Sequence, residues 1–324
     1  MMMYLYLVGG LVLLLVAGDL LVRGSIAIAT RLGIPPLIIG LTIVSFGTSA
    51  PELIISIDAA FRGASGIALG NIVGSNITNI LLVLGLPALI RVTQCTESGV
   101  RSSTAFMMAV SVIFMSLSWD GLLDLRAGII FLALLGFFLS WTVWTSRQQK
   151  SEPNDLIDEE MLEEAPSNLW LAAVFTIVGI IGLPVGGNFA VQGATDIARS
   201  WGVSEAAIGL TVVALGTSLP ELVTTLVAAL RNQAAVAIGN VVGSNIFNIL
   251  GIMGVTATII PIQVPEQMID FDFWIMVATS ALMLPIALLR MPITRIRGVG
   301  MLLAYGCYIT FVFKSGANHA PQLF

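Results

Sequence analysis

Long apolar stretches, separated by short polar segments, follow one another from the start of the chain to its end. An α-helix of about 20 residues crosses the roughly 30 Å hydrocarbon core of a bilayer. Ten stretches reach or approach that length, at 3–32, 36–61, 67–90, 102–118, 123–146, 168–199, 205–230, 234–260, 271–289 and 298–314. The pattern predicts an all-α membrane protein with ten transmembrane helices, of which the long first and sixth should be tilted.

The composition excludes several other classes of protein. Hydrophobic residues make up 57% of the 324 residues and charged residues only 10%, whereas soluble domains carry about 25% charged residues. A net charge of -5 without a basic patch excludes a nucleic-acid partner. With two cysteines and the single histidine His319, the chain also lacks the ligands of a zinc site and a histidine-based catalytic triad. We therefore expect neither an enzyme nor an organic cofactor, and a lipid bilayer as the surroundings.

Basic residues are distributed unevenly between the loops. With their flanks, the loops after odd-numbered spans hold nine Lys and Arg residues, and the other loops hold four. We expect the protein to lie in the inner membrane of the cell. The positive-inside rule then places the odd-numbered loops in the cytoplasm and both termini outside. The acidic segment 147–167 should be a solvated cytoplasmic linker rather than a regulatory calcium site, because such charge runs are usually unstructured.

An internal repeat recurs at a constant offset of 169 residues. The segments 40–81 and 209–250 share 24 identities in 42 positions without a gap. They include GTSAPEL and GNIVGSNITN in the first copy, and GTSLPEL and GNVVGSNIFN in the second. We divide the chain into a first repeat at 1–146 and a second at 168–324. Five spans in each repeat would invert the second relative to the first, an arrangement typical of secondary transporters with a central site.

The most similar parts of the repeats carry an acid in the middle of an apolar span. A carboxylate there costs about 2.5–3.5 kcal/mol unless it is compensated. Glu52 and Glu221 occupy equivalent positions, and no Lys or Arg lies near the middle of the neighbouring polar spans. A protonated or paired structural glutamate is the alternative, but two symmetric acids favour ion binding. By contrast, Asp58 has Val227 as its counterpart and pairs with Arg62 in our interpretation.

A proline precedes each acid and should interrupt its helix. Pro51 and Pro220 cannot donate a backbone hydrogen bond, and a glycine lies four residues before each of them. Carbonyl groups just before the break, including those of Ser45 and Ala214, then become possible ion ligands. Irregular backbone at this depth is tolerated only where it lines a cavity or is buried in protein.

Hydroxyl and amide side chains accompany the acids at helical spacing. Thr48 and Thr217 lie four residues before the glutamates, and a second series recurs at four-residue steps in the next span. In that series we favour ion ligation for Ser75, Asn79, Ser244 and Asn248. We favour contacts between helices for Asn71, Asn76, Asn240 and Asn245.

All of these candidate ligands are oxygen atoms, which hard cations such as calcium and sodium prefer. Two ionised glutamates would be neutralised by one Ca2+ or by two Na+. A third Na+ would have to bind neutral oxygens, and its exchange for one Ca2+ would move net charge. The stoichiometry itself does not follow from the spacing of the residues.

The two repeated segments resemble the α-repeats of the cation/calcium exchanger superfamily, most closely those of prokaryotic sodium/calcium exchangers. The resemblance implies that Glu52 and Glu221 bind calcium and sodium, and that the first and sixth helices slide to expose the site alternately. It also implies a full ligand set of Thr48, Ser49, Thr217, Ser218, Ser75, Asn79, Ser244 and Asn248, with the carbonyls of Ser45 and Ala214. Some relatives carry an aspartate where this chain has Asn79 or Asn248.

The sequence thus predicts an antiporter that admits sodium and expels calcium, and we expect it to be monomeric. A proton/cation antiporter that uses the same glutamates is the alternative. Proton-coupled relatives lack the Thr-Ser-x-Pro pattern, which favours sodium. A cation channel is a third hypothesis, but channels line their pores with rings of like subunits or shallow sites.

Overall fold

The fold is helical, and the computed structural model describes residues 2–148, 166, 168–202 and 214–319. Most of the linker predicted at 147–167 and the beginning of the span predicted at 205–230 lie outside the described residues. Successive helices are α1 (Met2–Leu32), α2 (Pro36–Ile39), α3 (Ser45–Thr48), α4 (Ala50–Phe61), α5 (Ser65–Thr78), α6 (Gly85–Ile90), α7 (Ser98–Ser118), α8 (Leu125–Gln148), α10 (Leu169–Ser200), α12 (Ala214–Gly216), α13 (Leu219–Leu230), α14 (Ala234–Phe247), α15 (Gly254–Ile259), α16 (Phe273–Leu288) and α17 (Arg295–His319).

Short π-helical segments join several of these helices without a loop. They are η1 (Gly40–Val44), η2 (Asn79–Val83), η4 (Asn248–Met253) and η5 (Met268–Asp272). In the described part of the chain, the strands are β1 (Leu122–Leu123) and β2 (Ile262–Gln263), which pair antiparallel with Leu122 opposite Gln263. This small ribbon joins two interhelical connections and leaves the fold class as predicted, all-α.

The chain is a multi-pass membrane protein by the length and apolar character of its helices. Within the described residues, seven helices are long and apolar enough to cross a membrane, and the bent pair α2–α3 with α4 would make an eighth. The number ten therefore stays a prediction. α13 is a shorter apolar helix of 12 residues. It forms the end of the span predicted at 205–230, whose beginning lies outside the described residues.

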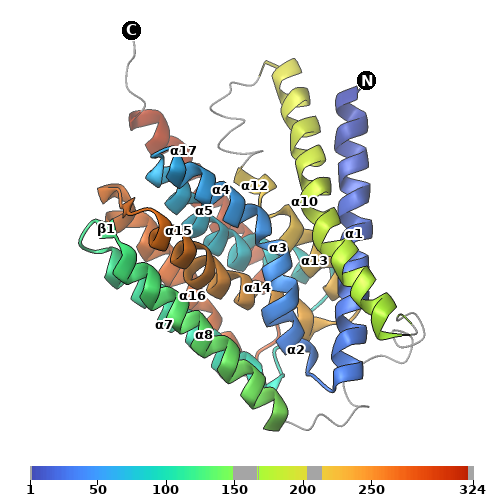
Figure 1. Ribbon diagram of the computed structural model, residues 1–324. Helices are drawn as coiled ribbons and strands as arrows, with labels where there is room; N and C mark the ends of the chain where they lie inside the picture. Colours follow the sequence, from blue (N-terminus) through green and yellow to red (C-terminus); the bar gives the residue numbers. More distant parts are fainter. Residues whose placement is uncertain (1, 149–165, 167, 203–213, 320–324) are drawn as a thin grey trace.

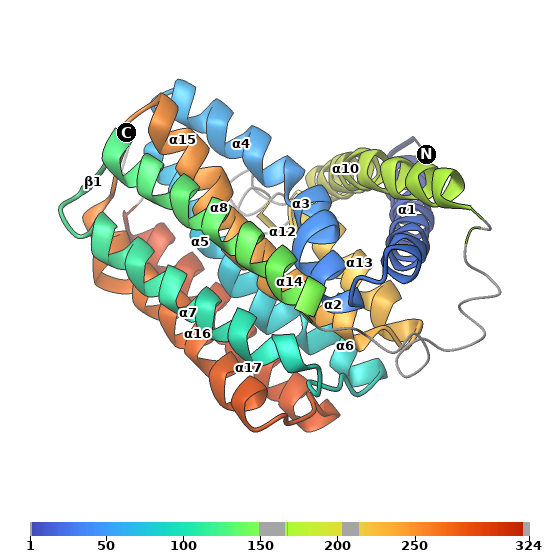
Figure 2. The ribbon, with the colours of Figure 1, turned by 60° about the horizontal axis from the view of Figure 1, so that its bottom comes forward.

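Two helices occupy the middle of the bundle, and they carry the repeated polar segments. In the span from Ser65 to Ile90, 78% of the apolar segment is buried inside the protein. In the equivalent span from Ala234 to Ile259, the buried share is 94%. The other spans are between 28% and 44% buried. Figure 2 shows α14 in the centre of the molecule, between α8 and the pair of α1 and α10. Polar side chains on these central helices are therefore shielded from lipid.

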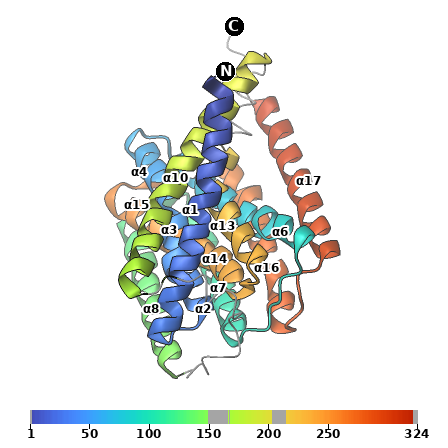
Figure 3. The ribbon, with the colours of Figure 1, turned by 90° about the vertical axis from the view of Figure 1, so that its right-hand side faces the viewer.

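The long helices α1 and α10 lie side by side along one side of the molecule (Figures 1 and 3). Their contacts run in opposite directions along the chain, because Gly10 meets Ala190 whereas Gly24 meets Thr176. Glycine permits this close approach: a Cβ on Gly193 would lie 2.3 Å from the backbone nitrogen of Leu7. Small residues of this kind let membrane helices contact each other through their backbones.

Candidate ion-binding site

The helix that carries Glu52 is broken, as the sequence predicts. α3 ends at Thr48, α4 begins at Ala50, and the two are inclined by 46°. Ser49 between them leaves the helical conformation, with φ -85° and ψ 6°. The second repeat has the same break at Ser218, with φ -86° and ψ 3°. Each glutamate consequently lies in the first turn of a new helix, where the helix dipole favours a negative charge.

Each central helix changes from α-helical to π-helical geometry at the asparagine that we predict to be an ion ligand. η2 begins at Asn79 and η4 begins at the equivalent Asn248. A π-helical segment inserts an extra residue into a turn and often marks a functional site. We did not predict these segments, because the apolar sequence that follows each asparagine reads as ordinary helix.

The two carboxylates are buried, and most of their oxygens lack a partner. Glu52 and Glu221 are both 0% exposed. Oε1 of Glu221 accepts a hydrogen bond of 3.0 Å from the Ser49 hydroxyl. The other three carboxylate oxygens have no hydrogen bond to the described residues. Buried charges are normally paired or bound to a metal, so three unpartnered acceptors indicate a place for a cation.

Thr48 connects the hinge of the first repeat with the central helix of the second. Its hydroxyl lies 3.2 Å from Oδ1 of Asn240, to which it donates, and 3.4 Å from the hydroxyl of Ser244. The predicted ligands of the two repeats thus converge on one buried region between α3, α4, α13 and α14. This contact between the repeats agrees with the central site expected from the sequence.

A ring of four asparagines orients two of the predicted ligands. Nδ2 of Asn79 donates to Oδ1 of Asn245, and Nδ2 of Asn248 donates to Oδ1 of Asn76, each at 3.1 Å. Asn76 and Asn245 in turn donate to each other's backbone carbonyl at 3.3 Å. The Oδ1 atoms of Asn79 and Asn248 remain buried without a hydrogen-bond partner among the described residues. The site region therefore contains two further buried acceptors that have no partner among the described residues.

Asn71 and Asn240 hold neighbouring helices together. Nδ2 of Asn71 donates to the carbonyl of Glu52 at 3.1 Å and to the Ser56 hydroxyl at 2.9 Å. Asn240 makes the matching bonds to the carbonyl of Glu221 at 3.4 Å and to Thr225 at 3.0 Å. These contacts between helices agree with the interpretation made from the sequence.

The remaining predicted ligands differ in their surroundings. Ser75, Ser218 and Ser244 are buried, whereas Thr217 at the second break is partly exposed. The Ser45 carbonyl already accepts the Ser49 N–H at 3.0 Å and the Thr48 hydroxyl at 3.3 Å, which reduces its capacity for an ion in this conformation. Ala214 is the first residue of α12.

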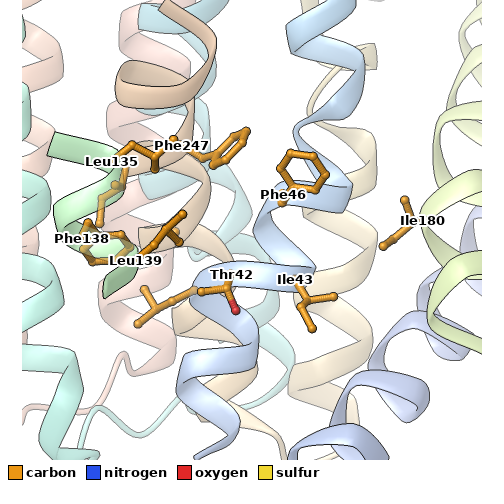
Figure 4. Close-up of a pocket in the computed structure, with 11 residues that line it drawn as sticks. Thr42, Ile43, Phe46, Leu135, Phe138, Leu139, Ile180 and Phe247 are labelled. Carbon is orange, nitrogen blue, oxygen red and sulfur yellow. The ribbon is translucent and has the colours of Figure 1, made fainter. Parts of the chain in front are cut away.

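An apolar cavity beside the first hinge is distinct from this oxygen-rich region. It has a volume of about 270 Å3 and is lined by Phe46, Phe138, Ile180, Phe247 and their apolar neighbours (Figure 4). The hydroxyl of Thr42 at its edge donates to the Ile38 carbonyl. The lining is almost entirely apolar, which does not suit a hard cation. No group of three or more His, Cys, Asp or Glu side chains forms a metal site in the described part of the chain.

Charged pairs form between neighbouring residues of single segments, and the pair of Asp58 with Arg62 agrees with the sequence. Arg62 approaches Asp58 at 2.7 Å within α4, and Arg199 approaches Asp196 at 3.6 Å within α10. Asp19 lies 3.7 Å from Arg23, but its second oxygen lies 2.5 Å from Arg231, directly after α13. The sequence did not predict this last contact, because its partners are 212 residues apart.

Comparison with known proteins decides the family. A family model described as "Sodium/calcium exchanger protein" matches residues 2–144 and 171–314. The chain belongs to the sodium/calcium exchanger family. The members of this family are exchangers, so this family member is a transporter and not an enzyme.

Relatives match this exchanger over almost its whole length. "Inner membrane protein YrbG" of Escherichia coli is 38% identical over 93% of both chains. "Sodium/calcium exchanger MaX1" of Methanosarcina acetivorans is 31% identical over 96% of this chain and 98% of the relative. A solved structure of the sodium-calcium exchanger NCX_Mj superimposes with a TM-score of 0.82 at 32% identity, over 96% of this chain and 98% of that one.

Proposed function

We propose that this family member is a secondary antiporter that exchanges sodium for calcium, with Glu52 and Glu221 as shared ion ligands. The observation that carries the proposal is a set of five buried acceptor oxygens, from Glu52, Glu221, Asn79 and Asn248, that have no partner among the described residues. Such a set suits a hard cation. The function printed for MaX1 and NCX_Mj supports the same assignment.

The proposed architecture is ten transmembrane helices in two repeats of opposite topology, with both termini outside. Reciprocal bonds between Asn76 and Asn245, which are 169 residues apart, support it, since a two-fold relation produces contacts of this kind. The antiparallel contact of α1 with α10 is also consistent with it. One chain contains both halves of the site, so we propose a monomer as the functional unit.

Transport would proceed by alternating access around the two glutamates. One Ca2+ or two Na+ balance the two carboxylates, so the same ligands serve both ions in turn. Glu52 and Glu221, helped by the hydroxyls of Thr48, Ser49, Thr217 and Ser218, would hold the ion, and Asn79 and Asn248 would add amide oxygens. Ser75 and Ser244, with the carbonyls of Ser45 and Ala214, complete the proposed set. Sliding of α1 and α10 would open the site to one side and then the other, so that sodium entry expels calcium.

Isotope flux in reconstituted proteoliposomes tests this function. Vesicles loaded with sodium should take up radioactive calcium when diluted into medium without sodium, and Glu52→Gln or Glu221→Gln should abolish the uptake. Asp58→Asn is the matched control, because Asp58 is an acid of α4 outside the site, and it should retain exchange. Undiminished uptake in either glutamate variant would refute the proposal. Uptake driven by a pH gradient and indifferent to sodium would instead establish a proton/calcium antiporter.

A further inference from the structure

The long helix α1 packs against α13 of the second repeat. A Cβ on Gly18 of α1 would lie 3.2 Å from Val223 and 3.7 Å from Val227, both on α13. Val223 is accordingly only 8% exposed. The equivalent residues of α4 are Ile54, which is 68% exposed, and Asp58, whose side chain is 57% exposed. The same face is thus buried on α13 and open on α4.

The other long helix does not restore the symmetry. Gly187 of α10 is the counterpart of Gly18, and a symmetric structure would place it against α4. Its nearest neighbours are instead the Gly216 carbonyl, at 3.8 Å from a Cβ placed on Gly187, and Pro220 at 3.9 Å. The pair of α1 and α10 is therefore displaced toward the second repeat. Among the described residues, α13 is covered by α1, and the equivalent face of α4 is exposed.

An ion pair fastens the closed side. Oδ1 of Asp19 on α1 accepts hydrogen-bond contacts from Arg231, directly after α13, at 2.5 Å. The side chains are only 30% and 24% exposed, so water screens them incompletely. Arg23 reaches the other oxygen of Asp19 and lies 5.8 Å from the ring centre of Phe175 on α10. The contact consequently links both long helices to the end of α13.

The sequence provides no equivalent ion pair on the open side. The offset of 169 relates Arg231 to Arg62, but it relates Asp19 to the neutral Asn188. Arg62 pairs with Asp58 in its own helix. Val227 replaces that acid in the second repeat, so Arg231 has no carboxylate one turn earlier and reaches α1 instead. The repeats thus differ at two positions, with Asp19 against Asn188 and Val227 against Asp58. Together these differences produce the ion pair between α1 and Arg231.

We infer that the Asp19–Arg231 pair is a latch that favours the conformation closed beside α13, which is the cytoplasmic side in the proposed orientation. The inference rests on the proposed alternating access. Opening that side requires α1 to leave α13 and separate the two charges. Among the described residues, the repeat offset supplies no comparable pair beside α4, because Asn188 carries no charge. The two conformations of the empty protein therefore differ in free energy, and the one open beside α4 is the more populated.

Cysteine accessibility tests the latch without relying on transport. In a background with Cys95→Ala and Cys307→Ala, one reporter is Ile55→Cys on α4 and the other is its counterpart Thr224→Cys on α13. Ile55 is 36% exposed and Thr224 is fully buried. A small thiol reagent, applied in ion-free buffer, should modify the first reporter faster than the second.

Asp19→Asn should shift this balance toward the other conformation. We expect modification of Thr224→Cys to accelerate by about fivefold, equivalent to about 1 kcal/mol, and modification of Ile55→Cys to slow. Arg231→Gln should shift the rates in the same direction, and the double variant Asp19→Asn with Arg231→Gln should behave like either single variant, which distinguishes a latch from two independent effects. Asp58→Asn is the control, because it removes the exposed pair within α4, and it should change neither rate.

Unchanged reporter rates in Asp19→Asn and Arg231→Gln would overturn the latch. Additive effects of the two substitutions in the double variant, when it purifies as a monodisperse protein, would also overturn it. The proposed function fails separately, if the unsubstituted protein does not exchange sodium for calcium in vesicles. In that case the reporter rates would still measure whether the ion pair holds α1 on α13.

Discussion

The hydroxyl of Ser49 in the first repeat donates a hydrogen bond of 3.0 Å to Oε1 of Glu221 in the second. The reverse relation, from Ser218 to Glu52, does not occur, because both carboxylate oxygens of Glu52 lack hydrogen-bond partners among the described residues. Two acids at equivalent positions therefore have different surroundings in this conformation. One carboxylate is oriented by the opposite repeat, and the other offers both of its oxygens to an ion.

Ser49→Ala should weaken calcium binding more than Ser218→Ala. A hydrogen bond to a charged group contributes about 1.5–3 kcal/mol, so we expect at least about a tenfold rise in the calcium dissociation constant for Ser49→Ala. Equilibrium titration of detergent-solubilised protein measures it without a membrane gradient. Equal losses in the two variants would contradict the asymmetric orientation of the carboxylates.

Asn245→Ala should lower calcium affinity although Asn245 is not a proposed ligand. The substitution removes the acceptor that holds the amide of Asn79 and so lets its Oδ1 rotate away from the ion. Loss of a group that orients a metal ligand typically reduces affinity by about 10- to 100-fold. Calcium titration again provides the measurement.

Ser111→Ala is the control for Asn245→Ala. Ser111 makes a buried hydrogen bond of 3.1 Å to Ser280, between α7 and α16. Its loss should reduce stability by about 1 kcal/mol without changing calcium affinity. If both variants changed affinity equally, the effect would be one of general stability and not of ligand orientation.

Gly10→Ala should destabilise the protein, whereas the neighbouring Gly9→Ala should be tolerated. A Cβ on Gly10 would lie 2.3 Å from the backbone nitrogen of Ala190 on α10, while a Cβ on Gly9 meets nothing within 4 Å. Overfilling a close contact typically costs about 1–3 kcal/mol. Thermal unfolding in detergent compares the two variants, and equal midpoints would contradict the close contact of α1 with α10.

Calcium should stabilise the purified protein against heat. A ligand that binds only the folded state at about 100 times its dissociation constant adds about 2.7 kcal/mol. The midpoint of unfolding should therefore fall when a chelator removes calcium. For Glu221→Gln, neither calcium nor the chelator should change the midpoint. A calcium-dependent shift that persisted in Glu221→Gln would place the binding site elsewhere.

Sequence predicted the hinge well because its causes are local. Pro51 lacks a donor and Glu52 carries a charge wherever the chain places them, so a break and a polar site follow from the residues themselves. The division of the asparagines into helix contacts and candidate ligands was predictable in part. Spacing put Asn79 and Asn248 on a suitable face, but it did not indicate that Asn76 and Asn245 hold them by their amides.

The sequence alone determined the membrane-spanning character, the repeat of 169 residues and the pair of buried acids. These properties depend on the length of apolar segments and on side-chain chemistry, which are written along the chain. Tertiary structure decided the ring of asparagines, the contact of Asp19 with Arg231 and the closure of α1 over α13 rather than α10 over α4. Each of these features depends on contacts between residues far apart in the chain. Because the two repeats are so similar in sequence, no local pattern indicates which of them a long helix will cover.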